Sequence, residues 1–316
     1  ASQSARTLPV TRETAFGSVF GVSVRRQASA PSDRRSPYFC AMASASAQVL
    51  LSGAAGAVAK DAFGLPAASL TPVYAWAGAV CYAMQLYFDF SGYSDMALGL
   101  GLLFGVQLPE NFRHPYCAGS VSEFWRRWHM TLSGWFRDYV YIPLGGSRNG
   151  RARTVFNKLL VFLATGLWHG TGWTFVLWGL WHGAFCGAET LLDRNKTLQT
   201  HWYGHVYTLL VVIFGFVLFR AESLPQALML LRTMLSGFTP VDACRLALRN
   251  LLTAGTVFWC LAGVLACFPV WEHAKARFDG SRWFSPALDA LTIVGLLLCL
   301  MQLASHSFQP FIYASF

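Results

Sequence analysis

The feature that most constrains this chain is a set of long stretches without a single Asp, Glu, Lys or Arg. Each reaches the roughly 20 residues that a helix needs to cross the hydrocarbon of a membrane. Inside lipid every backbone N–H and C=O must be bonded within the protein, and a helix achieves this within one segment. The pattern therefore predicts an all-α polytopic membrane protein. The charge-free windows are residues 62–88, 159–188, 197–219, 250–271 and 290–316.

The overall composition supports lipid as a solvent for this chain. Only 12% of its 316 residues are charged, against roughly 25% in a soluble domain. The net charge of +9 comes from 24 basic and 15 acidic residues. Basic loops on the cytoplasmic side of a membrane account for this excess, so we expect no nucleic-acid partner.

The chain divides near residue 48. Residues 1–48 are rich in Ser, Ala and Arg and hold no spanning apolar run, which predicts a leader of uncertain structure. Residues 49–316 are predicted to form one transmembrane domain with six or seven spanning helices and two or three shallow ones. The eight cysteines form no CxxC pair and are expected to be small core residues. The main candidate spans are about 72–88, 155–170, 172–190, 203–220, 248–270 and 284–305.

The segment 120–153 is aromatic and basic and carries too many charges to span. It is expected to form an interfacial amphipathic or re-entrant helix, capped by Ser120 or Ser122 and ended by the PLGG sequence at 143–146. Its proposed stripe, at i, i+4, i+7 and i+11, is Phe124, Trp128, Thr131 and Trp135.

Two histidines lie in the charge-free window GLWHGTGWTFVLWGLWHG, residues 166–183. Ionisable groups at membrane depth are costly, which makes them candidates for function. Neutral imidazole is the cheapest of them to bury, and His169 is suited to act as a general base on a hydroxyl. Gly170–Gly172 is expected to break the helix. His182 follows 13 residues later, roughly 140° around a continuous helix, and is expected to support the surrounding wall.

A third histidine, His129, lies in the sequence WRRWHMTLS beside Arg126, Arg127 and Arg137. Nearby cations are expected to keep its ring neutral. The arginines have two possible roles, as topology signals or as a clamp for a phosphate-bearing donor. The histidines lack the spacing of paired ligands and no HExxH is present, so no metal site is predicted.

Two acids, Asp89 and Asp95, flank the sequence SGYS. Asp89 is expected to end an apolar span and to cap the next helix, with Ser91 or Ser94 as alternatives. A buried acid that orients a histidine is the other possibility.

Several motifs in this order resemble the membrane-bound O-acyltransferase (MBOAT) family, and most closely its alginate O-acetyltransferase-like branch. The resemblance implies a helical fold with a central funnel or tunnel. It also implies that His169 is the catalytic histidine and His129 a second important one. The resemblance also implies that members of this branch begin with several more transmembrane helices, so we expect this chain to lack part of the N-terminal helices. The motifs are residues 87–101, 108–116, 123–146, 166–183 and 307–313.

The resemblance implies an acyltransferase in a bacterial inner membrane, spanning it several times. It would move an acetyl or other acyl group from a cytoplasmic donor, acetyl-CoA or an acyl carrier, with no bound cofactor. The acceptor would be a hydroxyl of an exported polysaccharide or of a periplasmic or extracellular partner protein. We expect His169 to act as general base and His129 to orient the reacting groups or polarise the acyl carbonyl. Donor contact is expected from Arg126, Arg127 and Arg137.

Two alternatives stay open at the level of sequence. One is transfer of D-alanyl or longer acyl groups to teichoic acid, protein or lipid. The other is a membrane scaffold or transporter subunit without catalysis, since transporters also place ionisable residues in spanning helices.

Overall fold

The computed structural model describes residues 23–24, 42, 44–66, 69–193, 195–236, 253–278 and 281–305. Helices dominate these residues, which agrees with the all-α prediction, and the described strands are a two-residue antiparallel pair, β1 (Ser23–Val24) with β2 (Val106–Gln107). Most of the predicted leader and the 307–313 motif lie outside the described residues. The helices are α3 (Gly53–Gly64), α4 (Pro72–Leu103), α5 (Val121–Arg127), α6 (Met130–Phe136), α7 (Gly150–His169), α8 (Trp173–Leu191), α9 (Asn195–Thr200), α10 (Trp202–Arg220), α11 (Leu224–Leu235), α13 (Ala254–Ala266), α14 (Val270–Phe278) and α15 (Phe284–Ser305).

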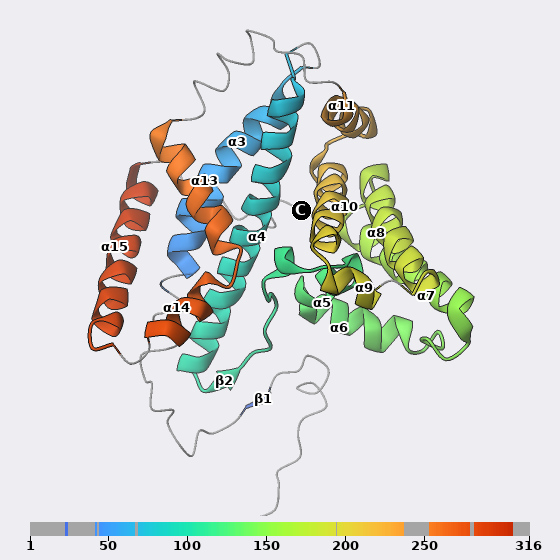
Figure 1. The fold of residues 1–316 in the computed structure, drawn as a ribbon, viewed down its shortest axis with the longest axis horizontal. Coiled ribbons are helices and arrows are strands. Elements are labelled where there is room, and N and C mark those ends of the chain that lie inside the picture. Colours follow the sequence, from blue (N-terminus) through green and yellow to red (C-terminus); the bar gives the residue numbers. More distant parts are fainter. Residues whose placement is uncertain are drawn as a thin grey trace, which may run out of the picture.

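The helices form two groups joined through α4 (Figure 1). On one side α3 and α13 pack against α4, and on the other α7, α8 and α10 pack in sequence. Helix α4 also contacts α10, which makes the connection between the groups. The short helices α5 and α6 lie near one end of α10, and α5 contacts both α8 and α10.

Helix α4 is continuous over 32 residues. It begins at Thr71, whose hydroxyl accepts a hydrogen bond from the backbone N–H of Tyr74 at 3.4 Å, with Pro72 in the first turn. Asp89 lies inside this helix, 7% exposed, and accepts a hydrogen bond from Gln48 Nε2 at 3.1 Å. The prediction that Asp89 ends the span and caps the next helix is therefore wrong: a side-chain amide contacts the carboxylate while the helix continues.

Helices α7 and α8 approach each other at backbone contact, and glycine makes this possible. A Cβ on Gly166 would lie 2.5 Å from the carbonyl oxygen of Phe175, and a Cβ on Gly179 would lie 2.3 Å from that of Phe162. Helix α7 ends at His169 and α8 begins at Trp173. The predicted helix break at Gly170–Gly172 is confirmed.

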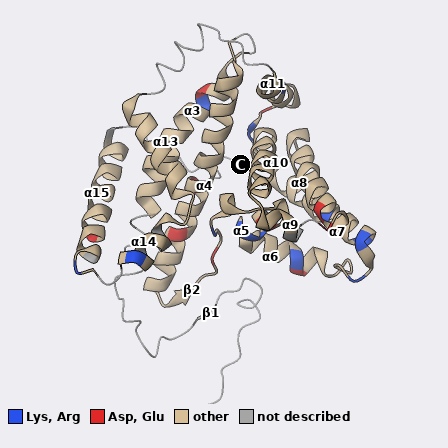
Figure 2. Cartoon of the chain, in the orientation of Figure 1, with Lys and Arg blue, Asp and Glu red and all other residues tan. Residues whose placement is uncertain are grey.

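Two of the described helices are long and apolar enough to cross a membrane, residues 202–220 and 286–304. The prediction of six or seven spans is higher because it counted charge-free windows. Helix α8, for example, holds no charged residue before Glu189 but is not one of the two candidate spans. The first candidate span is 56% buried and the second 6%. The low burial of the second is what is expected of a helix that faces lipid. Figure 2 shows that uncharged residues make up most of every helix.

The six cysteines within the described residues are free thiols, and four of them are buried. This matches the expectation of small core residues, while Cys40 and Cys244 lie outside the described residues.

Candidate active site

The segment predicted to be one amphipathic helix is two short helices, α5 and α6, separated at Trp128 and His129. Ser120 caps α5 as predicted, because its hydroxyl accepts a hydrogen bond from the backbone N–H of Glu123 at 3.1 Å. His129 breaks the helix by adopting the left-handed conformation, with φ of 43°. Such a conformation is uncommon for a residue other than glycine and persists where neighbouring contacts hold it.

Asn111 supplies those contacts. Its backbone carbonyl accepts from the N–H of Met130 at 3.0 Å, and its side-chain Oδ1 lies 3.1 Å from His129 Nδ1. The hydroxyl of Thr131 also donates to Oδ1, at 2.9 Å. Asn111 was assigned no role from the sequence, although it lies in the motif LPENFRHPY. Its burial, with the side chain 8% exposed, and its contacts with His129 and Thr131 are visible only in three dimensions.

His169 is held differently, by aromatic rings. Its ring centroid lies 4.9 Å from that of Trp168, 5.2 Å from that of Trp178 and 5.1 Å from that of Phe219. These neighbours come from α7, α8 and α10, so three helices fix the ring. Within the part of the chain that the structure describes, no three His, Cys, Asp or Glu side chains converge as metal ligands.

One cavity of about 560 Å³ is lined by both His129 and His169. We call it the histidine cavity. Its walls carry three cations, from Arg126, Arg137 and Lys158, and no carboxylate. Much of the remaining wall is aromatic, which suits a cavity that excludes water from a reacting group. The aromatic residues are Trp125, Trp128, Phe136, Tyr141, Phe162, Trp178 and Phe216.

The comparison with protein families agrees with this geometry. The profile described as "MBOAT, membrane-bound O-acyltransferase family" matches residues 57–230. The chain belongs to this family. Every residue that lines the histidine cavity falls inside the matched range. Members of the MBOAT family are membrane proteins, in agreement with the two candidate spans.

Curated relatives carry several substrates in their names. The chain is 38% identical over 276 residues to "Probable alginate O-acetylase AlgI" of Azotobacter vinelandii, covering 77% of this chain and 54% of the relative. It is 44% identical over 186 residues to "Peptidoglycan O-acetyltransferase" of Helicobacter pylori, covering 57% and 35%. It is 33% identical over 156 residues to "Teichoic acid D-alanyltransferase" of Bacillus subtilis, covering 45% and 40%. The chain thus spans about half the length of the alginate relative that it matches.

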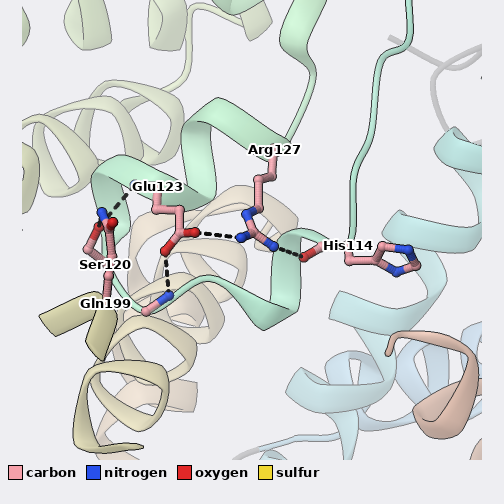
Figure 3. Close-up of polar contacts among 6 residues, drawn as sticks. His114, Ser120, Glu123, Arg127 and Gln199 are labelled. Carbon is pink, nitrogen blue, oxygen red and sulfur yellow. Dashed lines mark hydrogen bonds and ion pairs between the residues drawn. The ribbon is translucent and has the colours of Figure 1, made fainter. Parts of the chain in front are cut away.

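The three predicted arginines differ in whether they line the histidine cavity of this MBOAT structure. Arg126 and Arg137 line the histidine cavity, and Arg137 also pairs with the exposed Asp138 at 2.7 Å. Arg127 does not line it. Its guanidinium donates to Glu123 Oε1 at 2.6 Å and to the carbonyl of His114 at 3.5 Å (Figure 3). Arg127 therefore ties α5 to the preceding loop.

Lys158 is a cation that sequence reasoning missed. Its ammonium donates to Thr190 Oγ1 at 2.6 Å and to the carbonyl of Cys186 at 3.3 Å, both on α8. It also lines a second hollow of about 430 Å³, as Tyr141 does. Its position immediately before the charge-free window 159–188 was the available signal, because a cation within an apolar helix is costly.

His182 lies behind the wall and does not line the histidine cavity. It is 0% exposed, and its ring centroid lies 5.1 Å from that of Trp125 and 5.3 Å from that of Trp178. A Cβ on Gly215 of α10 would lie 2.4 Å from its Nε2 atom. This placement matches the supporting position expected for His182.

His129 lies between two seven-residue helices, outside the spanning segments. Burial lowers the pKa of its imidazole to about 3, and the charge of His169 acts in the same direction. The ring is neutral at pH 7, as expected, but the main cause is burial rather than the neighbouring arginines.

Proposed function

We propose that this MBOAT protein moves an acetyl group from a cytoplasmic donor to a hydroxyl of an exported polysaccharide, in a bacterial inner membrane. The observation that carries the proposal is the histidine cavity, which brings together His129 and His169, residues 40 positions apart in the sequence. A reaction between two substrates needs both held in one water-poor space, and a cavity of this size suits an acyl group and an acceptor hydroxyl.

In this mechanism His169 is the general base. It removes the proton of the acceptor hydroxyl while that oxygen attacks the thioester carbonyl of the donor. The carbon–sulfur bond then breaks, the thiolate departs and takes up a proton, and the acyl oxygen ester is the product. His129 lies on the same cavity and orients the reacting groups or polarises the acyl carbonyl.

The donor is acetyl-CoA or an acyl carrier, and both carry phosphate groups. Arg126, Arg137 and Lys158 face the cavity without a carboxylate on its wall, an arrangement that attracts an anionic group. We assign donor contact to these three cations. Arg127 is held in an ion pair with Glu123, so it is the least suited to donor contact among the three arginines predicted from the sequence.

The names of the curated relatives indicate the class of acceptor. The alginate relative covers the largest share of this chain among the three described, which favours an alginate-like polysaccharide and a periplasmic or extracellular acyltransferase partner. D-alanyl transfer to teichoic acid is the second candidate, because the Bacillus subtilis relative carries that name. A scaffold without catalysis is the outcome if no transfer occurs.

The test is acetyl transfer in membrane vesicles that hold the protein, a labelled acetyl donor and candidate polysaccharides, with products identified by mass spectrometry. His169→Ala should lower kcat about 100- to 10,000-fold, the usual contribution of a general base. His201→Ala, at an exposed histidine beside α10, is the matched control and should act as wild type. Wild-type turnover in His169→Ala at equal protein levels would contradict the proposal.

A further inference from the structure

Asn111 is buried beside the histidine cavity but does not line it. Its side-chain amide links two parts of the chain. On one side Nδ2 donates to Ser94 Oγ of α4 at 3.2 Å. On the other side Oδ1 lies within hydrogen-bond distance of His129, in the turn before α6, and of Thr131, in the first turn of α6. The amide is therefore held from both ends, and it cannot rotate without losing contacts on each side.

The contacts determine which end of the amide faces that turn. The backbone N–H of Thr131 points at the amide from 3.3 Å, and a backbone N–H can only donate. The atom that it meets must therefore be the carbonyl oxygen, Oδ1. The opposite orientation would place Nδ2 against this donor and leave the N–H without an acceptor.

The orientation of the Asn111 amide determines which ring nitrogen of His129 carries the proton. Since Oδ1 can only accept, the Nδ1 atom 3.1 Å away must carry the hydrogen of this bond. A neutral imidazole has one N–H and one lone pair. The lone pair is therefore on Nε2, and this is the ring nitrogen left for a ligand, because Nδ1 is engaged with a residue outside the cavity wall.

We propose that Asn111 is a positioning residue that fixes His129 as the Nδ1–H tautomer, so that Nε2 accepts a hydrogen bond from a second hydroxyl of the saccharide acceptor, next to the one that reacts. This rests on the proposed acyl transfer and decides between the two roles open to His129. With a lone pair on Nε2, the neutral ring has no hydrogen to give to the acyl carbonyl. It holds the neighbouring hydroxyl instead, while His169 takes the proton of the hydroxyl that reacts.

The backbone reinforces this assignment. The carbonyl of Asn111 accepts from the N–H of Met130 at 3.0 Å, and the N–H of Arg113 donates to the carbonyl of Arg127 at 2.9 Å. Two such bonds hold the loop against the chain on either side of His129. His129, with its left-handed φ, lies between these two bonds.

The direct test is ¹⁵N nuclear magnetic resonance of the ring nitrogens in the protein, labelled on histidine and held in lipid vesicles. Subtraction of the spectrum of His129→Gln identifies the His129 signals. We expect a protonated Nδ1 and an unprotonated Nε2 at neutral pH. An unprotonated Nδ1 would overturn the assignment. This measurement does not depend on any acyl-transfer activity, so failure of the proposed function is recognised separately.

The kinetic test compares Asn111→Leu with Asn111→Asp. Leucine removes the acceptor, and we expect kcat to fall about 100-fold with the KM for the donor unchanged. Aspartate keeps an acceptor for Nδ1, and we expect the kcat of Asn111→Asp to be at least tenfold higher than that of Asn111→Leu. Ser94→Ala removes the contact on the other end of the amide but keeps Oδ1 as an acceptor for His129, so it should lower kcat less than Asn111→Leu.

Two results would overturn the positioning role. One is a wild-type kcat in Asn111→Leu. The other is an equal loss in the Leu and Asp variants when both are folded, since that pattern indicates a purely structural contact. If Asn111→Leu does not accumulate, Asn111→Asp and the tautomer spectrum still decide the question.

Discussion

The two sides of the histidine cavity are built by different physical means. His129 is fixed by hydrogen bonds to one asparagine, which set both its place and its tautomer. His169 is fixed by three aromatic rings and by the glycine contact between α7 and α8. Hydrogen bonds to Asn111 therefore orient the ring of His129, and contacts with aromatic rings position the ring of His169.

The largest effect is expected when the hydrogen-bonded ring of His129 is removed. His129→Gln should lower kcat about 100-fold, because the variant keeps a polar side chain but loses the imidazole lone pair that orients the acceptor. Steady-state kinetics in membrane vesicles measure the effect. The control is His201→Gln, at an exposed position, and equal rates in both variants would contradict a role for His129.

The close contact between α7 and α8 can be disturbed by substituting its glycines. Gly179→Ala adds a methyl group where the nearest backbone oxygen would be 2.3 Å away, so α7 and α8 must separate. Overpacking of this kind costs about 1–3 kcal/mol, and we expect a lower midpoint of thermal unfolding together with reduced kcat.

The matched control for that variant is Gly172→Ala. There the nearest atoms to an added Cβ lie at 3.6 Å and 3.7 Å, which is ordinary contact. An equally large loss of thermal stability in Gly172→Ala would show that helix packing is not the cause.

A smaller effect is expected for the donor. Arg126→Gln should raise the KM for the donor about tenfold, since one charge-assisted contact is worth roughly 1.5 kcal/mol or more. The neighbouring Arg127→Gln should leave this KM nearly unchanged, because Arg127 lies off the cavity wall in an ion pair. Donor titrations of both variants give the answer, and equal KM values would remove the donor role of Arg126.

The smallest expected effect is on pH dependence. Burial lowers the pKa of His129 to about 3, so its functional neutral form is present at all pH values well above 3 and is lost only as the pH falls through that value. Between pH 5 and pH 8 the profiles of kcat/KM for wild type and His129→Gln should have the same shape. An inflection near the ordinary histidine pKa of roughly 6.5 that disappears in His129→Gln would contradict this.

Local signals in the sequence predicted local structure well. The Ser120 cap and the helix break after His169 were both predictable, because each depends on neighbouring residues. The interruption of the amphipathic stripe at His129 was not predictable, since it depends on Asn111, 18 residues earlier. The continuous α4 was missed for the same reason: Asp89 accepts a hydrogen bond from Gln48, which lies 41 residues earlier in the helical segment 47–52.

The candidate site shows the same division. Single residues such as His169 and His129 were identified from their motifs, and the structure places both on one cavity. Which of the arginines reach that cavity was beyond the sequence, because Arg126 and Arg127 are adjacent and chemically identical. The difference lies in helix geometry, which points neighbouring side chains of α5 in different directions.

The central claim, that His129 and His169 act on one reaction in one cavity, is tested most directly by a double-mutant cycle on kcat. The variants are His129→Gln, His169→Ala and the combination, each measured with saturating donor and acceptor in vesicles at equal protein levels. Residues that act as a unit are strongly non-additive. We predict that the double variant loses about as much as His169→Ala alone. Losses that multiply across the cycle would contradict the claim and would place the two histidines in separate events.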